Sequence, residues 1–221
     1  MRHKSSIEIV FAGHELILDA NACLFWPAYQ ILIVSDLHLE KGSFLARHGS
    51  PLPLHDTLDT LLRLQAMVEY YQPKILVSLG DNVHDWQGLK RMLPEHRQLL
   101  AAISAKVVKW LWIIGNHDQN ELSAPELAAI SCVNDHVIDS IILSHDKLAG
   151  DVYQIIGHYH PCATINAVRG KCFAFNQKTL VMPAFGSYTG GLDIASLAFE
   201  QAIGEKSRVC LIHRQKIWRV K

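Results

Sequence analysis

Five segments of this 221-residue chain place aspartate, asparagine or histidine directly after a run of apolar residues. The clearest is Gly80-Asp81-Asn82-Val83-His84, which follows the apolar run 75–79. Four further segments have the same form: Asp36-Leu37-His38, Gly115-Asn116-His117-Asp118, His145 and Gly157-His158-Tyr159-His160. A short apolar run bounded by polar residues is typical of a buried strand. The sequence therefore predicts five strand ends that carry these side chains.

A single Asp-x-His segment is weak evidence for a site, because both residue types also occur in turns, where they bond backbone groups. Five such segments are stronger evidence. Buried carboxylates and imidazoles gathered at one rim would be costly without a compensating cation. Carboxylate, imidazole and amide ligands without thiolate suit Mn²⁺, Fe or Zn²⁺, of which we favour Mn²⁺. The pattern therefore predicts a site for divalent metal ions.

The elements that must position these segments follow from hydrophobic periodicity. Apolar residues recur at helical spacing from 55 to about 71, between the first two apolar runs. The glycine- and proline-containing segment 42–53 is expected to be irregular and to lie over the strand ends. A second helix is expected around 87–104, either kinked or split by Pro94. A short helix is expected at 121–130.

Shorter elements are predicted on both sides of this central part. We expect strands at 7–11, 15–18, 23–26, 107–114, 136–143, 152–156, 163–168, 172–175 and 179–182, a helix near 193–203, and a terminal hairpin of 207–213 and 216–220. The sequence shows no internal repeat or linker that would divide two domains. One layered α/β domain covering residues 1–221 is the simplest interpretation.

Composition excludes several classes of protein. Lys+Arg and Asp+Glu both number 21, so net charge gives no support for a protein that coats nucleic acid. The five cysteines show no C-x-x-C spacing, which fits a reducing compartment better than a disulfide framework. No apolar run has the length of a membrane span or forms a signal-peptide core. We therefore expect a cytoplasmic protein with no membrane partner.

The ordered series D-x-H, G-D-x-x-H, G-N-H-D, H and G-H-x-H resembles the calcineurin-like metallophosphoesterase superfamily. This resemblance implies a four-layer αββα sandwich with two metal ions at the strand ends. It also implies which residues bind them. One ion would take Asp36, His38 and His160, the other Asn116, His145 and His158, and Asp81 would bridge both.

Further segments narrow the resemblance: Gly13-His14-Glu15-Leu16, Trp26-Pro27-Ala28, Asp36-Leu37-His38-Leu39-Glu40-Lys41-Gly42, Arg47-His48-Gly49, Met182-Pro183-Ala184-Phe185-Gly186 and Thr189-Gly190-Gly191-Leu192-Asp193. These segments are similar to those of the DNA-ligase-associated bacterial metallophosphoesterases. That similarity implies a phosphodiesterase or endonuclease of the DNA-damage response. It also implies functional association with a DNA ligase and a helicase or exonuclease.

The residue types are compatible with a two-metal mechanism. Two ions about 3.5 to 4 Å apart can activate a bridging hydroxide for in-line attack on phosphorus. The leaving alkoxide needs a proton, and His117 is the predicted general acid. Asp118 is expected either to orient His117 or to serve as a turn or capping residue. His84 is expected to support a ligand or to face the substrate rather than to bind metal.

Residues that contact the substrate are harder to predict. Lys41, Arg47 and His48 are candidate phosphate contacts, or alternatively solvated loop charges. Trp86 could stack on a base, although packing in the core or the loop is favoured. The segment 206–221 contains basic but no acidic residues, so it could contact a nucleic-acid backbone or protect an exposed strand edge by its charge.

Three functions are compatible with these observations. The preferred one is a cytoplasmic two-metal phosphodiesterase, a nuclease acting on DNA ends or single strands in repair. The second is a hydrolase of small phosphoesters, nucleotides or cyclic nucleotides. The third is a non-catalytic, metal-stabilised scaffold for repair proteins, which the complete ligand set and His117 argue against.

Overall fold

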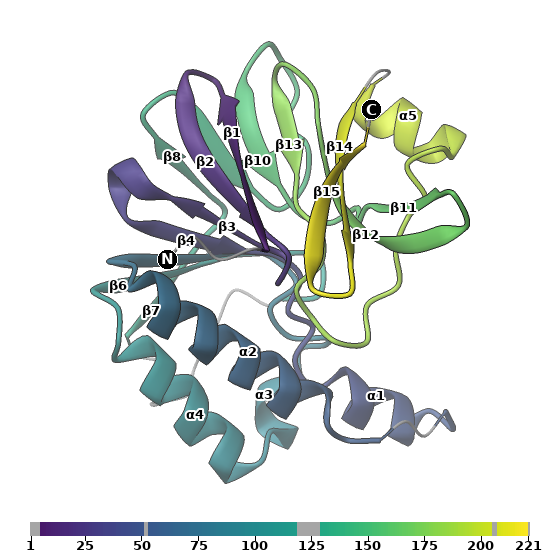
Figure 1. Ribbon diagram of the computed structural model, residues 1–221. Coiled ribbons are helices and arrows are strands. Elements are labelled where there is room, and N and C mark those ends of the chain that lie inside the picture. Colours follow the sequence, from purple (N-terminus) through teal and green to yellow (C-terminus); the bar gives the residue numbers. More distant parts are fainter. Residues whose placement is uncertain (1–4, 51–52, 119–128, 205–206, 221) are drawn as a thin grey trace.

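Two β-sheets packed face to face make up most of the computed structural model, which describes residues 5–50, 53–118, 129–204 and 207–220 (Figure 1). The first sheet has seven strands in chain order: β1 (Ser6–Phe11), β2 (His14–Asp19), β3 (Cys23–Trp26), β4 (Ile31–Val34), β5 (Ile75–Leu79), β6 (Lys109–Ile113) and β7 (Ile130–Val133). Strands β1 to β4 pair antiparallel, and β4 to β7 pair parallel. The carboxyl ends of β4, β5 and β6 therefore meet at one edge.

The second sheet has the strand order β15-β14-β12-β13-β10-β9-β8, with β11 paired to β12. Its strands are β8 (Asp135–Ile138), β9 (Ile141–Ser144), β10 (Tyr153–Ile156), β11 (Cys162–Ile165), β12 (Val168–Phe175), β13 (Thr179–Val181), β14 (Arg208–His213) and β15 (Lys216–Val220). Strands β9, β10 and β13 are parallel neighbours. Their carboxyl ends therefore lie together as well.

Helices cover the outer faces of the sheets. These helices are α1 (Lys41–Arg47), α2 (Asp56–Tyr71), α3 (Gly88–Arg91), α4 (Pro94–Ser104), α5 (Leu197–Ile203) and the 3₁₀ turn η1 (Pro27–Tyr29). Helices α2 and α4 lie side by side on the first sheet (Figure 1), where Leu64 and Leu100 pack against Leu76. On the second sheet, Phe199 of α5 packs with Ile156. This mixed α/β fold with two sheets confirms the predicted fold class.

The main core lies between the two sheets. It takes Ile33, Val77 and Leu111 from the first sheet and Ile155 and Leu180 from the second. The same cluster extends from Ile9 to Ile217, which lie near opposite ends of the chain. None of the described helices is long and apolar enough to cross a membrane.

Several predicted elements differ from the structure. Residues 41–47 form α1, where an irregular segment was expected. Of the two outcomes predicted for helix 87–104, the structure has the split, into α3 and α4, because proline is favoured at the first position of a helix. The expected strand 136–143 is the hairpin β8–β9, and the strand expected at 163–168 is divided between β11 and β12.

Two further expected helices begin later than predicted or lie mostly outside the described residues. The helix expected at 193–203 begins only at Leu197, because the Ser196 side chain caps it by accepting a hydrogen bond from the backbone N–H of Phe199. Most of the helix expected at 121–130 lies outside the described residues, and Ile130 already belongs to β7.

Candidate metal centre

The five polar segments lie where the carboxyl ends of the two sheets face each other. Asp36 and Asp81 follow β4 and β5, and His145 follows β9. Their exposed fractions are 0%, 4% and 4%, so the site is built below the surface. The residues Asn116, His117, His158 and His160, which follow β6 and β10, complete the rim.

The backbone at these strand ends is conformationally unusual. Asp36, His38, Asp81, His158 and His160 all have φ between 43° and 67°. Non-glycine residues in the left-handed region cost of order 1 kcal/mol or more each, and they cluster at functional sites. The turns direct these side chains toward one another at the expense of local stability.

Two glycines allow the strand ends to approach closely. A Cβ atom at Gly115 would collide with the backbone nitrogen and the carboxylate of Asp81. A Cβ atom at Gly157 would collide with the hydroxyl of Ser35 and the carboxylate of Asp36. These glycines are therefore required for the loops of the two sheets to bring their polar side chains together.

One cluster consists of Asp36, His38, Asp81 and His160, whose ligand atoms all lie within 4.8 Å of one another. His160 Nε2 lies 3.1 Å from Asp36 Oδ1 and 3.3 Å from His38 Nε2. His38 Nε2 lies 3.6 Å from Asp81 Oδ2. These distances bring two carboxylates and two imidazoles to one point.

A second cluster shares Asp81 with the first. His145 Nε2 lies 3.4 Å from Asp81 Oδ1 and 3.1 Å from His158 Nδ1. Asn116 lies beside them, with its Nδ2 atom 3.4 Å from His158 Nδ1. A half-turn of that amide would present its oxygen, the donor that a metal requires. Asp81 thus faces one cluster with each carboxylate oxygen.

The spacing of these atoms fits divalent ions. Two nitrogens bound to one ion at about 2.0–2.1 Å in tetrahedral geometry lie about 3.4 Å apart. The imidazole nitrogens of His38 and His160 are 3.3 Å apart, and those of His145 and His158 are 3.1 Å apart. Within the described residues, the ion pairs of Asp36 and Asp81 are all with histidine. A bound cation would compensate the charge of two buried carboxylates that lie this close together.

The protonation states also suit metal binding. Burial lowers the pKa of His38 to about 2, although Asp36 opposes this shift, so the imidazole is neutral at physiological pH. Burial raises the pKa of Asp36, but contacts with His160, His145 and Ser35 outweigh it, and the net shift is downward. A neutral imidazole beside an ionised carboxylate is the ligand form that metals bind.

Three histidines form a further group at the rim. His84 Nδ1 lies 3.3 Å from His38 Nδ1, and the His84 ring stacks on His117 with a centroid distance of 5.0 Å and an interplanar angle of 20°. The His117 side chain is 45% exposed, and its backbone N–H donates to Asp81 Oδ1. Burial, followed by Lys41 and His117, lowers the pKa of His84 to about 4. His117 is therefore the member of the group that is open to a substrate.

Asp118 contacts backbone rather than the His117 ring. Its carboxylate accepts hydrogen bonds from the backbone N–H groups of Asn82, Val83 and Gly115 and from the side-chain amide of Asn82. Burial raises the pKa of Asp118, although these N–H donors oppose the shift. Asp118 therefore ties the loop after β5 to the loop after β6.

The sequence did not reveal a second side-chain network that connects two loops of the site. Ser43 donates to Glu40, the guanidinium of Arg91 donates to Ser43, and Arg91 also forms an ion pair with Asp85. Glu40 is only 6% exposed. This network joins the loop after β4 to the loop after β5. No local pattern could reveal it, because Arg91 lies 48 positions from Ser43.

The structure places the three predicted phosphate contacts in different surroundings. Burial lowers the pKa of Lys41, although Asp56 and Asp81 oppose this shift, and Lys41 begins α1 three residues after His38. Arg47 and His48 lie exposed at the far end of α1. The ring of His48 packs on Phe44, whose own ring contacts His84. Lys41 is therefore the residue of the three that lies near the ligands.

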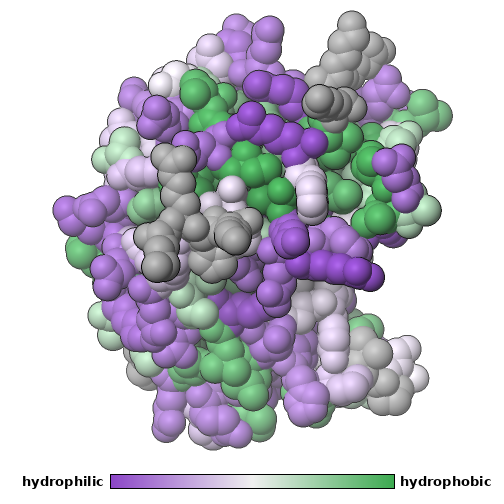
Figure 2. Space-filling view, in the orientation of Figure 1, coloured by the Kyte–Doolittle hydropathy of each residue, from purple (hydrophilic) through white to green (hydrophobic). Residues whose placement is uncertain are grey.

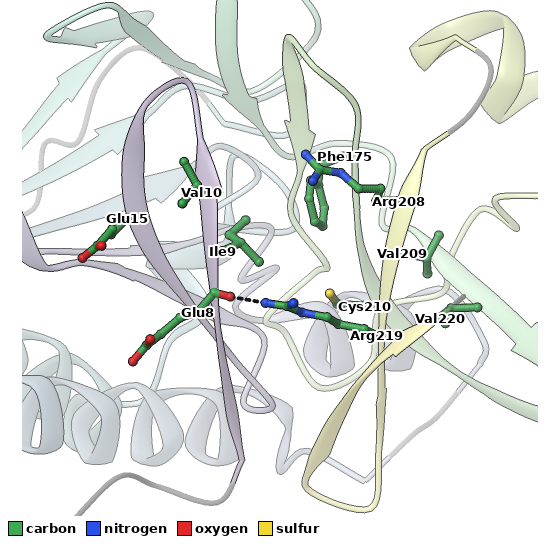
Figure 3. Close-up of a pocket in the computed structure, with 10 residues that line it drawn as sticks. All are labelled: Glu8, Ile9, Val10, Glu15, Phe175, Arg208, Val209, Cys210, Arg219 and Val220. Atoms are coloured by element: carbon green, nitrogen blue, oxygen red, sulfur yellow. Dashed lines mark hydrogen bonds between the residues drawn. The ribbon is translucent and has the colours of Figure 1, made fainter.

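Trp86 is 54% exposed, so it does not pack in the core, and its partly covered ring lies under the ammonium of Lys90 in α3. The basic C-terminal hairpin is partly engaged elsewhere. Arg208 lies over the Phe175 ring, and Arg219 donates to the Glu8 carbonyl. Both arginines line a cavity of about 430 Å³ between β1 and the β14–β15 hairpin (Figure 3). Figure 2 shows hydrophobic surface in this hollow with hydrophilic residues around it.

Comparison with known proteins agrees with this geometry. A family model for calcineurin-like phosphoesterases matches residues 29–186. The crystal structure of Pseudomonas putida nuclease MPE is similar at 27% sequence identity and a TM-score of 0.79, over 97% of this chain and 100% of that one. The protein of unknown function AQ665 from Aquifex aeolicus matches at 18% identity and a TM-score of 0.42, over 59% of this chain and 78% of that one. No curated protein matches.

Proposed function

The chain belongs to the calcineurin-like phosphoesterase family, and we propose that it is a two-metal phosphodiesterase that cleaves DNA ends or single strands in repair. The family and the solved nuclease support a metal-dependent phosphoesterase. The observation that carries the two-metal part is Asp81, which directs one oxygen into each cluster. The nuclease neighbour, which matches along nearly the whole chain, supports a nucleic-acid substrate.

The two clusters support the proposed metal ligands. Asp36, His38 and His160 would hold one ion, Asn116, His145 and His158 the other, and Asp81 both. Mn²⁺ is the favoured ion, and Fe or Zn²⁺ would accept the same donors. When bound, such ions supply the Lewis acidity that polarises a phosphoryl oxygen and lowers the pKa of water.

His117 is the proposed general acid. Its side chain is the exposed member of the three-histidine group, and its backbone is held by Asp81. A proton on its ring can therefore pass to the leaving oxygen at the rim. General acid catalysis of this kind contributes about 10²- to 10⁴-fold to the rate.

The contact between His38 and His84 fixes a tautomer. His38 directs Nε2 toward the metal ligands, so in the metal-bound protein its proton must be on Nδ1. This Nδ1–H faces His84 Nδ1 at 3.3 Å, which must then accept the hydrogen bond. His84 therefore carries its own proton on Nε2 while it stacks on His117. We assign His84 the role of positioning His117.

Lys41 is the proposed contact for a nonbridging phosphate oxygen, because an ammonium near the clusters can bind an anion there. Arg47 and His48 could extend this contact along a polynucleotide backbone from the exposed end of α1. The five free cysteines are compatible with the proposed cytoplasmic location. Work alongside a DNA ligase and a helicase or exonuclease remains a prediction from the sequence resemblance.

A reconstitution experiment tests the proposal. The Mn²⁺-loaded protein is assayed on a single-stranded oligonucleotide, the matching duplex, bis-p-nitrophenyl phosphate and p-nitrophenyl phosphate. We expect cleavage of the oligonucleotide and the small diester, with little hydrolysis of the monoester. Cleavage of the small diester without any cleavage of nucleic acid would favour the small-phosphoester alternative. Failure to hydrolyse any of the four would favour the scaffold alternative.

A further inference from the structure

Trp86 is an exposed aromatic side chain beside the candidate catalytic histidines. Of the five tryptophans, Trp26, Trp110 and Trp112 are fully buried or nearly so, whereas Trp86 is 54% exposed. Trp86 lies two residues after His84, so their Cα atoms are at most about 7.6 Å apart. The indole therefore lies outside the core, on the loop that also carries His84.

The loop that carries Trp86 is held on both sides. Asp85 accepts a hydrogen bond from the backbone N–H of Gln87 and forms an ion pair with Arg91. The backbone N–H of Gly88 donates to the carbonyl of Asp85 at 2.8 Å. A side chain on such a fixed backbone loses less conformational entropy when it binds a partner.

A cation accompanies the indole. The ammonium of Lys90 lies over the Trp86 ring, 5.5 Å from its centroid. An aromatic face and an adjacent ammonium are the two elements with which proteins bind single-stranded nucleic acid, one for a base and one for the backbone. Resting on the proposed nuclease function, we propose that Trp86 and Lys90 bind one unpaired nucleotide next to the scissile phosphate, Trp86 stacking on its base and Lys90 contacting its phosphate.

This site selects single strands over duplex. The faces of a base inside a duplex are covered by its stacked neighbours, so an indole can stack only on an unpaired base or on the terminal pair at a duplex end. The site takes any base, because stacking uses the π-face and reads no hydrogen-bonding edge. The preferred substrate is therefore a single strand, or a duplex with an unpaired segment at the point of cleavage.

A base-deletion experiment tests the site. Fluorescein-labelled, phosphorothioate-linked single strands, each with one abasic residue at a different position, are titrated with the Mn²⁺-loaded protein, and the Kd is measured by anisotropy. For the wild type we expect one position at which loss of the base raises the Kd about 5- to 150-fold. Trp86→Ala should raise the Kd for the intact strand by the same factor and remove the dependence on position. Trp86→Phe should retain the dependence of the Kd on the abasic position.

Trp218→Ala is the matched control, because Trp218 is 56% exposed but lies on β15. It should leave the positional profile unchanged. A Trp86→Ala variant with the wild-type profile, or a wild type with no sensitive position, would overturn the proposal. These results are distinct from failure of the nuclease function itself, which would appear as cleavage of bis-p-nitrophenyl phosphate without cleavage of any oligonucleotide.

Discussion

Asp36 and Asp81 at the strand ends, and Glu8 and Glu15 in the hollow beside β1, are carboxylates in two different surroundings. The first pair is almost fully buried, and its ion-pair partners within the described residues are histidines. The second pair is exposed and lines a cavity of about 430 Å³ together with Arg208 and Arg219 (Figure 3). The cavity is large, but its charged groups do not converge on one point.

The difference lies in how each charge is compensated. In the hollow, Arg208 rests on Phe175 of the neighbouring strand β12, and Arg219 bonds a carbonyl of β1 across the two sheet edges. At the strand ends, imidazoles surround two buried carboxylates, an arrangement that suits a bound cation. The functional region is therefore identified by buried metal-ligating side chains that converge on one point without a fixed counter-charge. The volume of a cavity does not identify it.

The largest expected effect is the loss of Asp81. Asp81→Ala removes a ligand from both clusters, so we expect loss of bound metal and a fall in kcat of about 10³-fold or more on bis-p-nitrophenyl phosphate. The matched control is Glu15→Ala in the hollow, which should change activity by no more than about twofold. Metal analysis of both purified variants accompanies the assay. An Asp81→Ala protein with normal metal content and activity would remove the distinction between the two regions.

A smaller, more selective effect is expected for His117. His117→Asn should lower kcat about 10²- to 10⁴-fold on a substrate with an alkoxide leaving group. The loss should be much smaller with p-nitrophenolate, because this weakly basic leaving group needs little protonation. Metal content should be unchanged, in contrast to Asp81→Ala. Equal losses on both substrates would exclude His117 as the proton donor.

The next smaller effect is expected for substitutions of His84. His84→Asn retains an acceptor near the position of Nδ1, which faces His38, whereas His84→Gln retains only a polar group near Nε2. We expect a loss of about 10- to 100-fold for the Gln variant and a smaller loss for the Asn variant. Nitrogen-15 spectra of the wild-type histidine rings should show His84 protonated on Nε2 after metal loading. A spectrum with the proton on Nδ1 would contradict the assigned tautomer.

Acid should destabilise the metal-free protein through the same region. Burial lowers the pKa of His38 from 6.5 to about 2, so below pH 6.5 the unfolded chain binds a proton that the folded chain does not. The stability is present above pH 6.5 and is lost as the pH falls, by up to about 1.4 kcal/mol per pH unit. Urea unfolding between pH 7 and 5 measures this slope. His38→Gln should flatten the slope, and Glu15→Gln in the hollow should not.

The local parts of the site could be predicted from sequence, because each ligand follows an apolar run within a few residues. The long-range contacts could not. Gly42 suggested an irregular segment, yet α1 forms there because the Gly42 N–H donates to Asp56, and a Cβ atom at Gly42 would collide with that carboxylate. The exposed position of Trp86 was not the favoured prediction, since hydrophobicity favours burial of an indole.

The smallest effect is expected for a substitution in the hollow. Arg219→Ala removes a hydrogen bond from the β15 side chain to the carbonyl of Glu8 in β1, which joins the edges of the two sheets (Figure 3). Because this contact is exposed, its loss should lower the free energy of unfolding by only about 0.5–1 kcal/mol. Arg214→Ala, at the exposed turn of the same hairpin, is the control and should leave stability unchanged. Both variants should retain wild-type metal content and activity, since neither arginine contacts a cluster. If Arg219→Ala reduced kcat or bound metal, the two regions would be coupled through the sheets. The hollow could then no longer be regarded as a cavity between strand edges that is independent of the metal clusters.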